Sequence, residues 1–181
     1  LRGFTRISQE HGAEAVVEML NDYFHHLGEE IFVNNGTIDK FIGDAILAVF
    51  GSPEPDEHHP WRAVYAAIAM QHRMPEINER RRSQGLPTCE LGIGIYTGEV
   101  LHGFIGTENR LEYTVIGDTV NKAARYSDGA KATEIAMGPT TYEFVKYHMP
   151  ATLCMISTKH EDDLPAYILD WNQIPLTQFE G

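Results

Sequence analysis

An α+β fold is the class that the sequence predicts, with short strands in hairpins packed against amphipathic helices. Long segments with apolar residues at helical spacing alternate with short apolar runs. Neighbouring runs are separated by Gly-containing turns, as in antiparallel hairpins. A doubly wound parallel sheet would instead alternate single strands with helices. With 181 residues, the chain is long enough for one domain with a sizeable core.

The first helix is expected over residues 12–35. Its apolar side chains recur near helical spacing: Val16, Val17, Leu20, Phe24, Leu27 and Ile31. Asn34, Asn35 and Gly36 follow, and both residue types suit the left-handed conformation that ends many helices. The helix is therefore expected to end there.

A β-hairpin is expected next. Residues 37–41 and 45–50 are short apolar runs on either side of Ile42-Gly43-Asp44, which suits a tight turn. A second long helix is expected over residues 60–82, where apolar side chains again recur at helical spacing. Pro75 lies inside it and can kink a helix.

A second hairpin is expected between residues 91–96 and 99–105, which are β-like and joined at Thr97-Gly98. The remaining elements follow in order: a helix that begins at Gly117 or Asp118 and runs to Tyr126 or beyond, a strand near 134–137, a helix over 139–147, and strands near 152–157 and 166–170.

The chain is acidic, with a formal net charge of -12. That charge argues against nucleic acid or an anionic membrane surface as a partner. Cys89 and Cys154 have neither zinc nor redox spacing, which favours reduced thiols in a cytoplasmic setting. The sequence contains no apolar run of membrane-spanning length and no signal peptide. Because it begins at Leu1 without a methionine, we expect a fragment of a longer protein, whose sensor or membrane region is not seen here.

Asp44 is the first candidate for chemistry. It follows Gly43 at the hairpin apex, so its carboxylate can reach a metal ion or serve only as a turn residue. One carboxylate makes a weak Mg²⁺ site, because that ion prefers octahedral oxygens shared among carboxylates, waters and phosphates. A second carboxylate is therefore expected nearby.

Lys40 and Thr114 are candidates for reading a purine base. Lys40 can donate to adenine N1, and Thr114 can accept from the N6 amino group. Guanine inverts both positions, so Lys40 would face a donor. Threonine can also donate, which makes its preference for adenine softer than that of an aspartate. A solvated strand lysine is the alternative reading of Lys40.

Asn121 and Arg125 are four residues apart and share a face of the predicted helix. Arg125 suits a phosphoryl oxygen and Asn121 a ribose or water oxygen, and an exposed polar pair is the alternative. Gly3-Phe4-Thr5 can present backbone amides to phosphate. The pairs His25-His26 and His58-His59 are interpreted as solvated, because adjacent residues do not face each other on a helix.

Four blocks resemble the class III nucleotidyl cyclases in the family's order: residues 1–5, 39–45, 92–98 and 112–125. The resemblance covers essentially the whole chain, so one catalytic domain is expected over residues 1–181. It implies a ferredoxin-like palm with a βαββαβ core, hairpins, C-terminal additions and a truncated first strand. It also implies a head-to-tail homodimer with two shared sites that converts ATP to 3′,5′-cyclic AMP and pyrophosphate.

The resemblance carries roles to matching positions. Asp44 matches the second metal aspartate, and the backbone carbonyls of Ile42 and Leu1 help to hold two Mg²⁺ or Mn²⁺ ions. The other matches are Phe4 and Thr5 on the β- and γ-phosphates, Lys40 and Thr114 on the purine, Asn121 on the ribose, Arg125 as the transition-state cation and Lys159 on the triphosphate.

Departures from the family pattern are also visible. The first metal aspartate of the family stands immediately before the residue that matches Leu1, so the chain as given is expected to be impaired. Gly92 replaces an arginine that some relatives place on phosphate, and Tyr96 stands where many have histidine. The sequence around Lys159 lacks the usual lysine-glycine-lysine pattern.

The implied mechanism is two-metal, in-line attack of the ribose 3′-oxygen on the α-phosphorus, in cyclic-nucleotide signalling. Asp44 would come from one protomer, and the base- and ribose-binding residues from the other. The alternatives are a guanylate cyclase, which Lys40 disfavours, and a catalytically silent domain that binds nucleotide or only dimerises. A diguanylate cyclase would show a Gly-Gly-Asp/Glu-Glu-Phe turn, which this sequence lacks.

Overall fold

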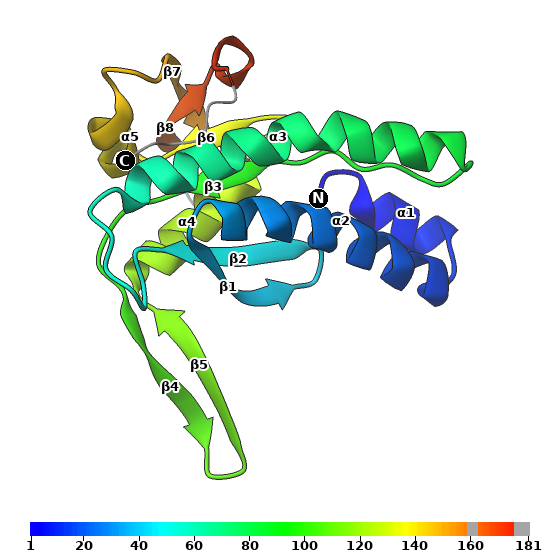
Figure 1. Cartoon of the computed structure of the whole chain (residues 1–181), viewed down its shortest axis with the longest axis horizontal. Coiled ribbons are helices and arrows are strands. Elements are labelled where there is room, and N and C mark those ends of the chain that lie inside the picture. The colour runs from blue at the N-terminus through cyan, green and yellow to red at the C-terminus, as the bar shows by residue number, and fades with distance from the viewer. Residues whose placement is uncertain (159–162, 176–181) are drawn as a thin grey trace.

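The computed structural model describes residues 1–158 and 163–175, and its fold is α+β as the sequence predicts (Figure 1). In chain order the elements are α1 (Phe4–Glu10), α2 (Ala13–Val33), β1 (Gly36–Ile42), β2 (Ala45–Phe50), α3 (His59–Ser83), β3 (Ile93–Ile95), β4 (Leu101–Thr107), β5 (Arg110–Ile116), α4 (Asp118–Gly129), β6 (Ile135–Met137), α5 (Pro139–Val145), β7 (Ala151–Ile156), β8 (Leu164–Leu169) and the 3₁₀ turn η1 (Trp171–Gln173). The elements α2, β1, β2, α3 and β3 follow one another in the order αββαβ. This is the predicted βαββαβ palm without its first strand.

The predicted hairpin is confirmed, because β1 and β2 pair antiparallel. Gly43 in its turn has a φ of +59°, a left-handed conformation that glycine adopts without steric cost. The pairing register shifts between Ile38 and Lys40, so Asp39 is an extra residue in β1. Such a β-bulge re-aims side chains and breaks the regular alternation of the strand.

The second predicted hairpin, between residues 91–96 and 99–105, is wrong. β3 instead pairs in parallel with β6, in a four-stranded sheet of order β3-β6-β8-β7. β4 pairs antiparallel with β5, from which only Glu108 and Asn109 separate it. A two-residue connection favours a tight hairpin, whereas β3 is held in the core by packing against α4.

Helices pack on both faces of the four-stranded sheet. On one face, Ile135 and Met137 of β6 belong to a buried cluster with Ile68 of α3. On the other face, Ala136 belongs to a cluster with Tyr126 of α4. The alternation of β6 side chains therefore joins α3 and α4 to opposite faces of one sheet.

A separate cluster joins α2 to α3 through side chains such as Tyr23 and Met74. α1, which the sequence analysis did not predict, docks on this cluster through its one buried residue, Ile7. Leu1 and Phe4 pack at the edge of the same cluster. The seven-residue helix is therefore positioned by tertiary packing, because so short a helix is not stable alone.

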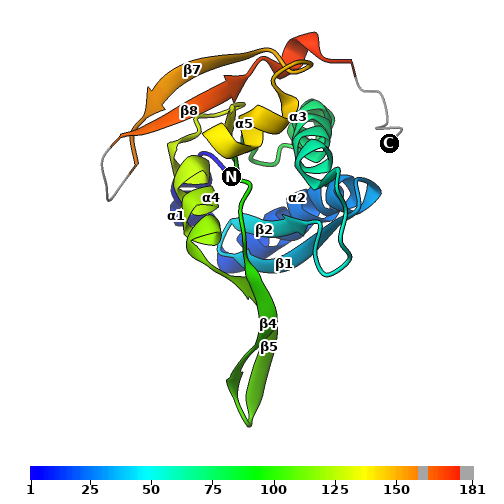
Figure 2. The ribbon, with the colours of Figure 1, turned by 90° about the vertical axis from the view of Figure 1, so that its left-hand side faces the viewer.

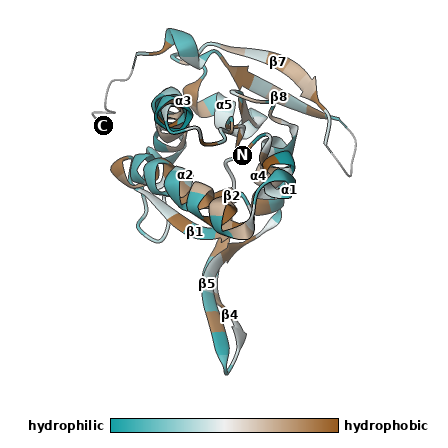
Figure 3. Cartoon of the chain, turned by 90° about the vertical axis from the view of Figure 1, so that its right-hand side faces the viewer, coloured by the Kyte–Doolittle hydropathy of each residue, from teal (hydrophilic) through white to brown (hydrophobic). Residues whose placement is uncertain are grey.

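The β4–β5 hairpin projects away from the body as an arm (Figures 1 and 2). Apolar and polar segments alternate along it (Figure 3). Its exposed apolar side chains are Leu101, Phe104, Ile105, Leu111, Tyr113 and Ile116. Among the described residues, none of the helices combines the length and the apolar character that crossing a membrane requires.

Candidate active site

The hairpin turn brings Asp44 next to the start of the chain, as the metal-site prediction requires. The backbone nitrogen of Leu1 lies 3.1 Å from Oδ2 of Asp44 and donates to the Asp44 backbone carbonyl, also at 3.1 Å. The Asp44 side chain is 34% exposed, so part of the carboxylate still faces outward. Leu1 and the Asp44 turn are therefore neighbours, with the carboxylate partly open to solvent.

The other residues predicted to bind metal or phosphate are near Asp44 or near Leu1 in the sequence. Ile42, whose carbonyl is a proposed metal ligand, is an exposed residue that ends β1 two positions before Asp44. Phe4 and Thr5 form the first turn of α1, where backbone N–H groups have no partner inside the helix. Since Leu1 and Phe4 pack together at the core edge, the start of α1 is anchored near the turn.

Lys40 and Thr114, the predicted purine-reading pair, are brought together by β1 and β5. Nζ of Lys40 lies 3.2 Å from Oε2 of Glu112 and 3.8 Å from Oδ2 of Asp39. The hydroxyl of Thr114 donates to Oδ2 of Asp39 at 2.7 Å. Hydrogen bonding to Lys40, and then to Arg110, holds the pKa of Glu112 below its usual value.

Asp39 is the central residue of this cluster. Its side chain is only 1% exposed, and its second oxygen accepts the backbone N–H of Val115 at 3.1 Å. Regular alternation would turn Asp39 and Lys40 to opposite faces of β1. The bulge at Asp39 lets both side chains face β5.

The helix predicted after residue 117 is confirmed as α4, which follows β5 almost directly. Asn121 is exposed and Arg125 half-buried, one turn apart along one face. Lys122 is occupied elsewhere: it forms an ion pair with Asp118 at 2.7 Å, which raises the pKa of the lysine. Asn121 and Arg125 therefore share one face of α4, on which the sequence analysis expects the ribose and the phosphate.

Arg2 fills the space that the absent side chain of Gly92 leaves. Its guanidinium donates to the backbone carbonyls of Ser127 and Ala130 at the C-terminal end of α4. A Cβ on Gly92 would lie only 2.6 Å from the guanidinium, so the two positions are linked. Tyr96, the other departure from the family pattern, stacks on Tyr126 of α4 with ring centroids 5.7 Å apart.

The sequence analysis interpreted the pairs His25-His26 and His58-His59 as solvated, and in each pair one histidine is exposed. His25 and His58 are exposed, but His26 and His59 are half-buried, and burial lowers the pKa of His59. Nε2 of His26 accepts from Arg80 at 2.9 Å, which places the ring proton on Nδ1. A metal at His26 would have to displace that arginine or that proton, so we assign none.

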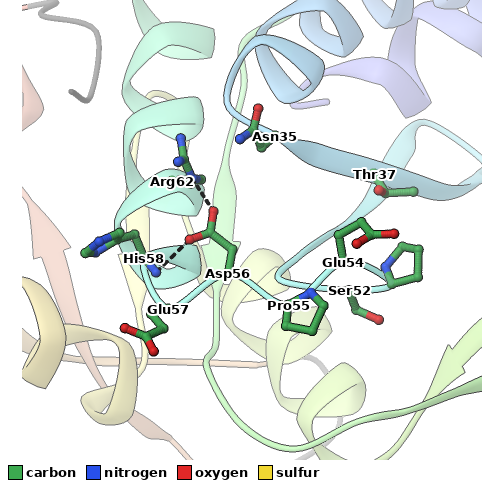
Figure 4. A pocket seen from close by; sticks show the side chains of 10 residues that line it. Asn35, Thr37, Ser52, Glu54, Pro55, Asp56, Glu57, His58 and Arg62 are labelled. Atoms are coloured by element: carbon green, nitrogen blue, oxygen red, sulfur yellow. Dashed lines mark hydrogen bonds and ion pairs between the residues drawn. The ribbon is translucent and has the colours of Figure 1, made fainter. Parts of the chain in front are cut away.

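Two hollows on the described surface are lined by none of the predicted site residues. A cavity of about 540 Å³ lies under the β2–α3 loop, where Asp56 accepts from the His58 amide and pairs with Arg62 (Figure 4). An apolar groove of about 690 Å³ runs between α2 and β1, past the stacked rings of Phe24 and Phe41. Neither hollow therefore coincides with the predicted polar site.

Sequence reasoning missed two residues of the polar cluster, Asp39 and Glu112. Glu112 has a readable signal, because it is two residues from Thr114 and so shares its strand face. Asp39 has no such signal in the sequence, since only the bulge turns its side chain toward β5. Lys159, predicted to bind the triphosphate, lies outside the described residues.

This α+β fold, with a carboxylate turn, a lysine–threonine pair and an asparagine–arginine helix face, is that of a nucleotidyl cyclase domain. The sequence model of the adenylate and guanylate cyclase catalytic domain matches residues 1–166. The chain belongs to this family, which confirms the resemblance stated from its motifs.

Individual relatives are similar over most of the chain. Adenylate cyclase 1 of Rhizobium meliloti (strain 1021) is 39% identical over 122 residues, which are 67% of this chain and 18% of that protein. Adenylate cyclase of Anabaena cylindrica is 40% identical over 129 residues, which are 69% of this chain and 25% of that protein. The chain therefore spans a quarter or less of the length of these relatives.

Solved structures of both cyclase types share the fold. The adenylyl cyclase CyaB from P. aeruginosa has a TM-score of 0.86 at 32% identity, over 93% of this chain and 88% of that chain. The guanylyl cyclase Cya2 has a TM-score of 0.86 at 36% identity, over 93% and 87%. Fold similarity therefore does not separate the two substrates, and the base-reading residues must.

Proposed function

We propose that the chain is the catalytic domain of an adenylate cyclase, which converts ATP to 3′,5′-cyclic AMP and pyrophosphate. The observation that carries this proposal is the pairing of Lys40 with Thr114 around Asp39. Adenine offers N1 as an acceptor and N6 as a donor, which complements a cationic donor and a hydroxyl acceptor. The similarity to two proteins named adenylate cyclase, at 39% and 40% identity, supports it further.

Residues of α4 and α1 would position the reacting groups. Asn121 holds the ribose, and Arg125 stabilises the charge that builds on the α-phosphoryl group as the 3′-oxygen attacks in line. Phe4 and Thr5 offer backbone amides to the β- and γ-phosphates. These roles fit an open site, since Asn121 and Thr5 are both exposed.

Cyclase domains of this class use divalent metal ions. The Asp44 carboxylate and the Ile42 carbonyl are the oxygen donors that Mg²⁺ or Mn²⁺ prefers, and the Asp44 side chain is partly exposed. Two ions bound there would lower the pKa of the ribose 3′-hydroxyl and offset the triphosphate charge. A residue joined to the nitrogen of Leu1 would start beside Asp44, where the family's first metal aspartate is expected.

A head-to-tail homodimer would complete two equivalent sites, with Asp44 from one protomer and Lys40, Thr114, Asn121 and Arg125 from its partner. Exposed apolar side chains on the arm support association, because monomeric proteins rarely expose many together. Leu101 and Phe104 are 72% and 73% exposed.

The first experiment measures cyclic nucleotide formation by the natural full-length protein, with ATP or GTP and with Mg²⁺ or Mn²⁺. Cyclic AMP from ATP, with little product from GTP, is the expected result. Preferential use of GTP would make the chain a guanylate cyclase, which its similarity to Cya2 keeps as the alternative. No product from either nucleotide, in a dimeric protein, would favour a silent domain.

Complementation tests the shared site. Asp44→Ala and Arg125→Ala should each abolish most turnover. Mixed dimers of the two variants would contain one site without substitutions, so a mixture should regain about a quarter of the original activity by statistical pairing. No recovery, with subunit exchange verified, would contradict a site built from two protomers.

A further inference from the structure

We propose that Asp39 determines nucleotide choice by fixing the polarity of the Thr114 hydroxyl, so that this hydroxyl can only accept from the substrate. The inference rests on the proposed function and adds a residue to it. Asp39 does not touch the base in this scheme; it acts through Thr114 and is therefore a positioning residue.

The first step is that Asp39 accepts a hydrogen bond with each of its two carboxylate oxygens. Its side chain is 1% exposed, and its two oxygens accept from different donors, the Thr114 hydroxyl at 2.7 Å and the Val115 amide at 3.1 Å. Lys40 adds a positive charge 3.8 Å from Oδ2. Both carboxylate oxygens are therefore taken by donors of the protein itself.

The second step concerns the single proton of the hydroxyl. A threonine hydroxyl has one O–H and two acceptor lone pairs. When Thr114 donates its proton to Asp39, only the lone pairs remain for a ligand. The ambiguity of threonine, which can normally donate or accept, is thereby removed.

The third step is the effect on the base. The N6 amino group of adenine can donate to those lone pairs, whereas O6 of guanine would face them with lone pairs of its own. Lys40 acts in the same direction, because it can donate only and guanine N1 carries a proton. Asp39 sets the Thr114 hydroxyl to the adenine pattern, and Lys40, 3.8 Å from the same carboxylate, has that pattern by its own chemistry.

An Asp39→Asn substitution tests this inference. It keeps the shape of the side chain and replaces one acceptor oxygen by an amide nitrogen that donates. The Val115 amide must donate to the carbonyl oxygen of the substituted side chain, so the new amide nitrogen faces Thr114. The Thr114 hydroxyl then accepts from that nitrogen, and its proton becomes free to donate to guanine O6. The ATP:GTP ratio of kcat/KM should fall about 10- to 100-fold, the usual consequence of one mismatched hydrogen bond.

Two further variants accompany it. Asp56→Asn makes the same chemical change at a carboxylate in the β2–α3 loop and should leave the ratio unchanged. The double variant Asp39→Asn, Thr114→Asp places an acceptor-only side chain opposite the new amide and should restore the preference for ATP. A purely structural role of Asp39 would lower both kcat/KM values together and would show no such rescue.

A binding measurement makes the test independent of turnover. The uncyclisable 3′-deoxy-ATP and 3′-deoxy-GTP should raise the melting temperature unequally in the original protein and more nearly equally in Asp39→Asn. If Asp39→Asn does not fold, Thr114→Val takes its place, since it removes the acceptor and keeps the volume. An unchanged ATP:GTP ratio in a folded, dimeric variant of either kind would overturn the inference. Absent or GTP-selective activity of the unsubstituted protein would instead overturn the proposed function.

Discussion

Gly94→Ala should damage both stability and catalysis, because β3 and α4 touch backbone to backbone at this residue. A Cβ on Gly94 would lie 2.5 Å from the carbonyl carbon of Tyr126 and 2.6 Å from Cα of Ser127. The backbone nitrogen of Ser127 would lie closer still. Ordinary contact begins near 3.4 Å, so α4 would have to move by more than about 0.9 Å. Neither side can yield by rotating a side chain, because the atoms involved are main-chain atoms.

The displacement has two measurable consequences. Overpacking of this kind costs about 1–3 kcal/mol of unfolding free energy, which urea denaturation would detect. α4 also carries Asn121 and Arg125, and a displacement of about 1 Å at a reacting centre can cost roughly 100-fold in rate. Cyclic AMP formation should therefore fall about 100-fold in protein that is still folded and dimeric.

A matched substitution separates this effect from a general loss of glycine. Gly12 has no heavy atom within 4 Å of a built Cβ and has a φ of −67°, so Gly12→Ala should leave activity unchanged. If Gly94→Ala retained its unfolding free energy within about 0.5 kcal/mol and its activity within twofold, the packing explanation would be refuted.

Three other substitutions probe the site and the core. Glu112→Gln should raise the KM for ATP roughly two- to fivefold with little change in kcat, because Lys40 loses an exposed ion pair that limits its positions; an unchanged KM would show that Lys40 needs no such restraint. Burial lowers the pKa of His59, so the unfolded chain takes up that proton first, and unfolding free energy should fall as pH drops below about 6.5. His59→Gln should show a weaker fall between about pH 7.5 and 5.5, and identical pH profiles would contradict this. Tyr23→Phe should cost about 1–3 kcal/mol, because the buried Cys89 amide loses its acceptor, while activity stays near normal.

The long helices were predictable from sequence because their own residues contain the signal. α2 and α3 have many turns of apolar periodicity, and their observed bounds agree with the prediction to within two residues. The sequence of β3 did not indicate which strand it pairs with. A short apolar run shows that a strand is present, but its pairing is decided by packing from distant segments, here β6 and α4.

The site was predictable in its residue types and only partly in its arrangement. The proximity of Lys40 and Thr114 was implied by the family resemblance, and spacing alone could not have produced it, since 73 residues lie between them. Asp39 was hidden because alternation assigns it to the wrong strand face. A bulge depends on how two strands pair, so one strand's sequence does not reveal it.

Asp39 and Asp44 lie on the same hairpin, and their surroundings assign them different tasks. Protein donors occupy both oxygens of Asp39, whose side chain is 1% exposed, so it can only orient its neighbours. Asp44 is 34% exposed at a turn, so its carboxylate can reach a metal ion. Loss of Asp44 should therefore lower turnover of ATP and GTP alike, whereas loss of the Asp39 carboxylate should change which of the two is used.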